Sequence, residues 1–210
     1  MLDALLQASR PVLAAAFTLW GAPVTWLEVV ACVLSVAMVL ANMRVNPVGW
    51  PLAIASSLLY ALLFADSKLY DEATLQIFFV AVSFWGWRQW LHGTHAGDTA
   101  LRVRWMDARA RWLAAAGTLI AWPLLALLLQ RTTDSDVPWL DALATVASVC
   151  GQILLGRKLV ENWPLWVAVN VFSVGLFAYK ALWLTALLYA VFALLAVAGW
   201  RAWRQIAVRG

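Results

Sequence analysis

The sequence predicts an all-α integral membrane protein, with seven core transmembrane helices arranged as two parallel three-helix repeats joined by a linker helix. Three observations predict this fold. The 210 residues are 64% hydrophobic and 12% charged, with a mean hydropathy of +0.80, whereas a soluble domain is about half apolar and about a quarter charged. Several apolar runs reach the roughly 17–25 residues that a helix needs to cross a bilayer. The chain is also similar to itself at a fixed offset.

Seven apolar runs predict the spans, at residues 24–42, 50–65, 73–90, 112–130, 139–155, 163–180 and 182–203. Residues 1–23 form an amphipathic segment that either lies on the membrane surface or adds a short span. We favour the surface because Pro11 interrupts a run that is already short. The predicted organisation is then a first repeat (24–91), a basic loop with the linker helix (92–136), a second repeat (137–204) and a tail (205–210).

The basic residues predict the orientation of these spans. With seven spans, one side receives four lysines and arginines and the other eleven. The more basic side is expected to be cytoplasmic, which places the N-terminus outside and the C-terminus inside. The two sets are Arg10, Lys68, Arg131 and Lys180 against Arg44, Arg88, Arg102, Arg104, Arg109, Arg111, Arg157, Lys158, Arg201, Arg204 and Arg209.

An internal repeat is the strongest signal in the chain. A shift of 113 positions places TWLEVVACVLSV on PWLDALATVASV, and 22 of the 65 positions from Trp26 to Trp90 are then identical without a gap. Pro51 and Pro164 each follow a tryptophan and suit the first turn of a helix. The motifs GWRQW (86–90) and GWRAW (199–203) are typical of an aromatic belt followed by a cytoplasmic charge.

The repeat has a consequence for topology and function. Each unit contains three spans, so two units joined directly would have opposite orientations. The extra span at 112–130 restores the orientation and makes the units parallel. Transporters with parallel repeats bind substrate near the membrane midplane, at the repeat interface. The count of spans therefore indicates a carrier of a small solute.

The polar residues inside the spans do not follow the repeat. An asymmetric ligand on the pseudo-axis would produce this difference, although drift at positions facing the interior would do so as well. The mismatched pairs are Asn170 with Ser57, Gln76 with Tyr189, and Ser173 with Tyr60.

One helical face carries the best candidate binding residues. Trp163, Trp166 and Asn170 lie at i, i+3 and i+7. An indole can stack on a ring, and an amide offers both donors and an acceptor. We favour substrate binding for Trp166 and Asn170, since polar groups inside membranes tend to be functional. The alternative is that Asn170 bonds to a neighbouring helix, and we favour a place in the interface belt for Trp163.

Several other polar residues are weaker candidates. Gln76 and Tyr189 begin the third span of their repeats at equal depth, where both substrate binding and packing fit the sequence. Serines often pack between helices. The serine and tyrosine candidates in the second span of each repeat are Ser56, Ser57, Tyr60 and Ser173.

Other classes of function find little support in the sequence. The acids Glu28 and Asp141 lie near span ends, so we expect no proton coupling. No nucleotide-hydrolysing motif is present, which argues against ATP coupling, whereas sodium coupling stays open. We expect no cofactor, metal site, enzymatic activity or nucleic-acid binding. A structural membrane protein would fit the repeat but not the asymmetric polar face.

The segments GRKLVENWPLWVAVNVFSVGLF, WLEVVACVLSV and LYDEATLQIFFVAVSFWGWRQW resemble the PnuC family of bacterial vitamin transporters. The resemblance covers the chain from Trp26 to Trp203 and is most specific in the run E-N-W-x-x-W-x-x-x-N. It implies a full-length relative of the SWEET carriers, assembled as a homotrimer in the inner membrane. Members carry nicotinamide riboside, and related branches carry thiamine, riboflavin or deoxynucleosides.

The resemblance also implies a mechanism and a site. Transport would be facilitated diffusion, made one-way when a cytoplasmic kinase phosphorylates the vitamin for NAD biosynthesis. The family's binding residues match Trp166, Asn170 and Gln76. Members that carry nicotinamide riboside tend to have an asparagine near Ser56-Ser57. This departure keeps thiamine open as an alternative substrate.

Overall fold

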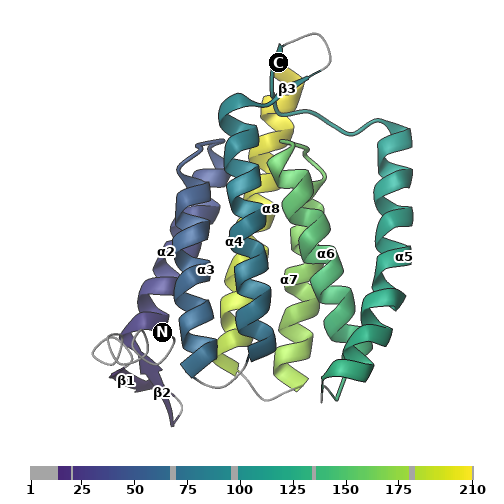
Figure 1. The fold of residues 1–210 in the computed structure, drawn as a ribbon. Helices are drawn as coiled ribbons and strands as arrows, with labels where there is room; N and C mark the ends of the chain where they lie inside the picture. Colours follow the sequence, from purple (N-terminus) through teal and green to yellow (C-terminus); the bar gives the residue numbers. More distant parts are fainter. Residues whose placement is uncertain are drawn as a thin grey trace. The chain divides into compact units, whose positions relative to one another are not determined.

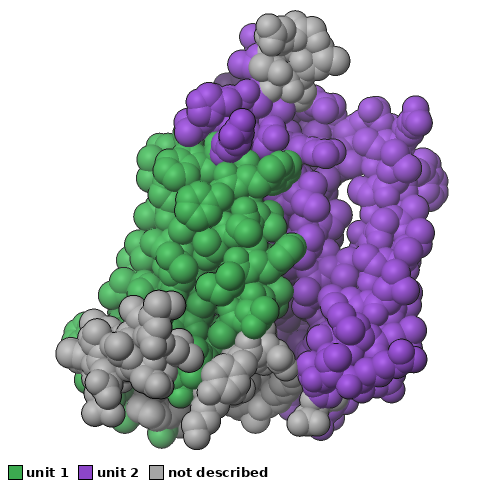
Figure 2. All heavy atoms as spheres, in the orientation of Figure 1, with its two compact units in different colours: residues 1–87 green, residues 88–210 purple. Residues whose placement is uncertain are grey.

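A computed structural model of the chain describes residues 14–19, 21–66, 70–95, 99–133, 136–179 and 183–209. It divides into two compact units, residues 1–87 and 88–210 (Figure 2). Seven long helices make up most of it (Figure 1), and five of them are long and apolar enough to cross a membrane within the described residues. The helices are α2 (Trp26–Met43), α3 (Gly49–Asp66), α4 (Tyr70–His92), α5 (Ala108–Thr132), α6 (Pro138–Gly156), α7 (Asn162–Tyr179) and α8 (Trp183–Arg209).

The seven predicted spans are confirmed as helices, with ends that differ by a few residues. Local chemistry explains several ends. Thr25 caps α2 by accepting the N–H of Glu28 at 3.1 Å, and Asp107 caps α5 by accepting the N–H of Ala110 at 2.6 Å. The largest difference is at the C-terminus, where α8 continues to Arg209 and includes most of the predicted tail.

The amphipathic N-terminal segment is not helical where the structure describes it before α2. Part of it forms a β-hairpin from β1 (Ala15–Leu19) and β2 (Ala22–Thr25), with Gly21 at a φ of +83° in the turn. A second short hairpin pairs β3 (Thr94–His95) with β4 (Thr99–Ala100). These two short hairpins were not predicted from the sequence, and they add to the helical fold without changing its class. The predicted location of residues 1–13 on the membrane surface lies outside the described residues.

The turns after α2 and α6 have the same backbone structure. Val45 and Lys158, which are 113 positions apart, both have a φ of +54°. The N–H of Val45 donates to Asn42 O at 3.0 Å, and the N–H of Lys158 donates to Leu155 O at 2.9 Å. Helices α3 and α7 then begin at equivalent positions, Gly49 and Asn162. The sequence repeat therefore coincides with a repeat of local structure.

Glycines let the large tryptophans pack inside each unit. In the first unit, a Cβ on Gly86 would overlap the ring of Trp50, which is 1% exposed. In the second unit, a Cβ on Gly199 would overlap the ring of Trp163, which is 3% exposed. These glycine–tryptophan pairs are again 113 positions apart. The glycine and the tryptophan of each pair therefore recur because they pack together. A location of the tryptophan in the interface belt does not explain the recurrence.

The tryptophans that end the GWRQW and GWRAW motifs are also buried. The rings of Trp90 and Trp203 lie 6.1 Å apart, and Trp203 meets Trp163 edge-on at 5.6 Å. The indole N–H of Trp90 donates to Leu155 O at 3.0 Å. A surface belt was the wrong interpretation for these two residues. The exposed rings of Trp26 and Trp139 do fit a membrane interface.

The segment before α5 is held against the turn between α6 and α7. Both carboxylate oxygens of Glu161 accept the backbone N–H of Met106, at 3.0 and 3.1 Å. Glu161 Oε1 also pairs with the guanidinium of Arg111, at 3.0 Å from Nε and 2.9 Å from the terminal nitrogen. Arg104 exchanges backbone hydrogen bonds with the same turn, at 3.1 and 3.0 Å. Helix α7 begins one residue after Glu161, so these contacts fix its start.

Candidate functional site

Helix α7 positions the two strongest candidates of the sequence, Trp166 and Asn170. They are four residues apart and therefore lie on one face of the helix. The Trp166 indole lies over Gly151 of α6, where an added Cβ would be 3.1 Å from Cε2 and 3.3 Å from Nε1. A Cβ at position 151 would therefore make the Trp166 ring shift by a few tenths of an ångström. The glycine thus fixes where the Trp166 ring lies against α6.

The Asn170 side chain is buried among the described residues. It is 6% exposed, and its amide makes no hydrogen bond within the described part of the chain. Ser173, one turn further along α7, is 4% exposed and likewise makes no hydrogen bond among the residues described. A fully buried amide normally finds a partner because leaving it unsatisfied costs about 1–3 kcal/mol, but the amide atoms of Asn170 are not among the fully buried unpaired atoms of the described residues. The alternative role for Asn170, a bond to a neighbouring helix, is therefore not what the described residues show.

Gln152 is a buried amide that the sequence reasoning missed. It follows Gly151 in α6, is 8% exposed and makes no hydrogen bond to any described residue. Because a helix rises 1.5 Å per residue, Gln152 lies at nearly the same depth as the glycine beneath Trp166. The available signal was a glutamine within an apolar span, at the position that matches Val39 in the other repeat. Two amides and an indole are thus found on the α6–α7 pair.

The remaining candidates in the second unit pack against neighbouring aromatic residues. Trp163 lies against Gly199 and Trp203, and its indole N–H has no hydrogen-bond partner among the described residues. The ring of Tyr189 meets that of Phe192 edge-on at 6.2 Å. Packing accounts for both positions, and substrate contact by either stays a prediction.

Four of the candidate binding residues lie in the first unit. Ser56 is 4% exposed and donates its hydroxyl hydrogen to Ala53 O at 3.0 Å, which uses this group within its own helix. Tyr60 stacks on Phe64 with ring centroids 6.0 Å apart. Gln76 and Ser57 are half-buried. Their part in binding stays a prediction.

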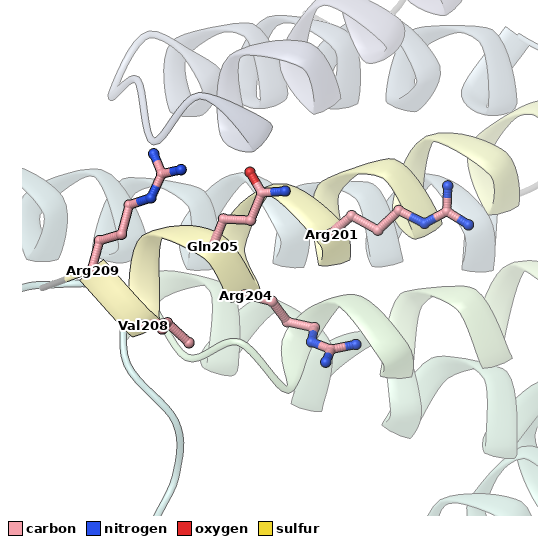
Figure 3. Close-up of a pocket in the computed structure, with 5 residues that line it drawn as sticks. All are labelled: Arg201, Arg204, Gln205, Val208 and Arg209. Carbon is pink, nitrogen blue, oxygen red and sulfur yellow. The ribbon is translucent and has the colours of Figure 1, made fainter.

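Charged groups outside the spans form two features of the second unit. Lys158 donates to Leu101 O at 3.1 Å and lies over the Trp90 ring at 5.1 Å, and partial burial lowers the pKa of its ammonium group. At the end of α8, Arg201, Arg204 and Arg209 line a shallow hollow, but their guanidinium groups spread apart along the helix (Figure 3). They do not converge on one point, as a built anion site would require.

Metal chemistry finds no support in the described part of the chain. No three histidine, cysteine, aspartate or glutamate side chains gather there in a way that could hold a metal ion. Cys32 and Cys150 are free thiols in α2 and α6. The polar groups of the candidate site are neutral amides and hydroxyls beside an aromatic ring. Such a set can hold a neutral or cationic ring compound by stacking and hydrogen bonds.

Comparison with known proteins gives consistent matches along the chain. A model of the family described as nicotinamide mononucleotide transporter matches residues 25–205. The chain is 27% identical over 208 residues to the nicotinamide riboside transporter PnuC of Escherichia coli, covering 87% of each chain. It is also 27% identical over 190 residues to the riboflavin/roseoflavin transporter RibM of Streptomyces davaonensis, covering 90% of this chain and 89% of that one.

A solved structure supports the fold. The crystal structure of the vitamin B3 transporter PnuC superimposes with a TM-score of 0.72 at 24% identity, covering 99% of this chain and 90% of that chain. This chain therefore has the fold of that structure, and five helices of its described part are long and apolar enough to cross a membrane. With a family match over residues 25–205, the chain belongs to the nicotinamide mononucleotide transporter family, the PnuC carriers that its sequence resembles.

Proposed function

We propose that this chain takes up nicotinamide riboside across the bacterial inner membrane. The observation that carries the proposal is the Asn170 amide, buried and unbonded within the described residues, four positions after the Trp166 indole. In this role Trp166 stacks on the pyridinium ring, and Asn170 holds a ribose hydroxyl or a ring substituent. The Escherichia coli relative, a nicotinamide riboside transporter, supports the choice of substrate.

The riboside is favoured over its mononucleotide, although the family description names the mononucleotide. Helices α2, α3, α6 and α7 contain no arginine or lysine, and those of α4, α5 and α8 lie toward the helix ends. A phosphate carries up to two negative charges and would find no cationic partner deep in the membrane. A neutral binding site is better suited to the dephosphorylated vitamin.

The transport mechanism in this proposal is facilitated diffusion by alternating access. The acids of α2 and α6, Glu28 and Asp141, lie in the first turns of their helices, where they suit the helix dipole and are far from the middle of the span. This position argues against a proton relay. Phosphorylation by a cytoplasmic vitamin kinase would then trap the substrate. The chain itself carries the vitamin and does not convert it.

The architecture in this proposal is a SWEET-like 3+1+3 arrangement. Helices α2–α4 and α6–α8 are the two parallel repeats, α5 is the linker, and the N-terminus is outside with the C-terminus in the cytoplasm. The equal helix starts and the equal turns at Val45 and Lys158 support the repeat. The many exposed apolar side chains of α5 suit contact with membrane lipid or with other copies in a homotrimer.

Riboflavin is the second candidate substrate. The RibM relative shows the same 27% identity and covers slightly more of this chain than the Escherichia coli relative. An indole and two amides would also suit an isoalloxazine ring. Thiamine stays a prediction that depends on Ser56-Ser57.

The proposal is tested by calorimetry on the purified protein with nicotinamide riboside, its mononucleotide, thiamine and riboflavin side by side. We expect binding of nicotinamide riboside and none of the mononucleotide. The Asn170→Leu variant should bind more weakly than the wild type, whereas Val171→Leu, at the exposed neighbouring position, should bind normally. Normal uptake by Asn170→Leu in proteoliposomes would remove Asn170 from the site. Binding of riboflavin or thiamine alone would change the substrate and keep the architecture.

A further inference from the structure

We infer that Gln152 is a substrate-binding residue that recognises the carboxamide of the vitamin. The inference deepens the proposed function and rests on it. Gln152 is 8% exposed within an apolar helix, and its amide makes no hydrogen bond to the described residues. Its amide atoms are not among the fully buried unpaired polar atoms of the described residues, so a molecule outside the chain can reach them.

Gln152 lies at nearly the same depth as the proposed stacking ring. The Trp166 indole lies over Gly151, the preceding residue in the same helix, at 3.1–3.3 Å from an ideal Cβ. Successive residues of a helix differ by only 1.5 Å in depth and point about 100° apart, so Gln152 leaves α6 beside the face that meets Trp166. A ring stacked on Trp166 would therefore have its substituents at the depth of the Gln152 side chain. Asn170 lies one turn further along α7, at the depth expected for the sugar of such a ligand.

The chemistry of the side chain indicates which substituent it would contact. A primary amide offers two donor hydrogens and one acceptor oxygen, and another primary amide is its complement. The carboxamide of a nicotinamide ring can therefore form two hydrogen bonds with Gln152. A carboxylate at the same position would present only acceptors and could use only the donor half of the glutamine. Gln152 would thus discriminate the amide form of the vitamin from the acid form.

The other repeat supports a functional rather than a structural reason for this amide. The equivalent of Gln152 is Val39, an apolar residue in α2, which is nearly as long as α6. The repeat therefore folds with an apolar side chain at this position. An amide is not needed for packing there, which leaves ligand contact as its explanation.

The test uses Gln152→Met, which keeps the length of the side chain and removes the amide. Calorimetry with nicotinamide riboside should show binding about ten- to a hundredfold weaker than in the wild type, as expected for the loss of two hydrogen bonds. The midpoint of thermal unfolding without ligand should stay about equal, because the amide makes no hydrogen bond to another described residue. Gln152→Leu is the second variant, and Ile153→Leu at the exposed neighbouring position is the matched control.

A second ligand identifies the contacted group. Pyridine riboside, which lacks the carboxamide, should bind the wild type and Gln152→Met equally. If Gln152→Met weakens the binding of both ligands by the same factor, the carboxamide assignment is overturned. If it leaves the affinity for nicotinamide riboside unchanged, any contact by Gln152 is overturned. A lower unfolding midpoint in both variants would identify Gln152 as a structural residue. If the wild type binds riboflavin or thiamine but not nicotinamide riboside, the proposed function itself fails, and this inference fails with it.

Discussion

Removing the Glu161 carboxylate should loosen the segment before α5 and lower the stability of the second unit. This carboxylate accepts the Met106 N–H with both oxygens and pairs with Arg111. A hydrogen bond to a charged group is worth about 1.5–3 kcal/mol. The Arg111 side chain is 54% exposed, so solvent screening limits the ion pair to at most about 1 kcal/mol. The backbone bond should therefore be the larger contribution.

These magnitudes predict an order among three variants. Glu161→Ala loses both interactions, and its free energy of unfolding should fall by roughly 2–3 kcal/mol, equivalent to about 5–10 °C in the unfolding midpoint for a chain of this size. Glu161→Gln keeps an acceptor for Met106 and should lose about 1 kcal/mol. Arg111→Gln should lose at most about 1 kcal/mol, and added salt should shrink this loss.

The assay measures unfolding of the purified protein in detergent. A second measurement records hydrogen exchange at the backbone amide of Met106. Exchange at this amide should quicken in Glu161→Ala and change little in Arg111→Gln. A loss in Arg111→Gln as large as that in Glu161→Ala would refute the reasoning, since the ion pair would then carry the whole effect. Unchanged stability in Glu161→Ala would refute the role of the contact altogether.

Three further predictions concern packing, binding and pH. Gly199→Ala should cause severe destabilisation, because the new Cβ would overlap the buried Trp163 ring; thermal unfolding measures this. Gly151→Ala should weaken substrate binding severalfold in calorimetry with little change in stability, because the Trp166 ring has to move by only a few tenths of an ångström. Burial lowers the pKa of Lys158 in the folded protein, so the unfolded chain binds more protons, and stability should rise with pH between the lowered pKa and 10.5. Unfolding of Lys158→Met across this range should lack that rise.

Each of these experiments has a control and an outcome that contradicts it. Gly175→Ala on α7 has open space around the new Cβ and should leave stability unchanged. A stable Gly199→Ala protein would show that the tryptophan can move aside. Full substrate affinity in Gly151→Ala would mean that the place of the Trp166 ring does not matter. A pH profile of Lys158→Met identical to that of the wild type would assign the rise to other groups.

The helices could be predicted from the sequence because their signals are local. Apolar runs and the offset of 113 placed all seven, and the capping by Thr25 and Asp107 explains two of the starts. The buried positions of Trp90 and Trp203 could not be predicted in this way. A tryptophan near a span end has the same sequence pattern whether it faces lipid or the interior, and only the packing of separate helices decides between them.

The candidate site could be predicted only in part. The spacing of Trp166 and Asn170 on one helix is readable from the sequence, because helical periodicity determines which residues share a face. Gln152 belongs to a different helix, and its relation to Trp166 depends on how α6 and α7 pack at Gly151. The contact of Glu161 with Met106 joins residues 55 positions apart, and no local pattern indicates it.

The two left-handed turns suggest a substitution that would raise the stability of the protein. A β-branched residue such as Val45 at a φ of +54° is strained, and left-handed backbone costs roughly 1–2 kcal/mol for residues other than glycine. Asparagine tolerates this conformation better, so Val45→Asn offers a thermostabilised protein for crystallisation or drug screening. The same exchange at Lys158 would give up its contacts with Leu101 and Trp90. The same bend is present twice, but only its first copy can be exchanged without losing other contacts.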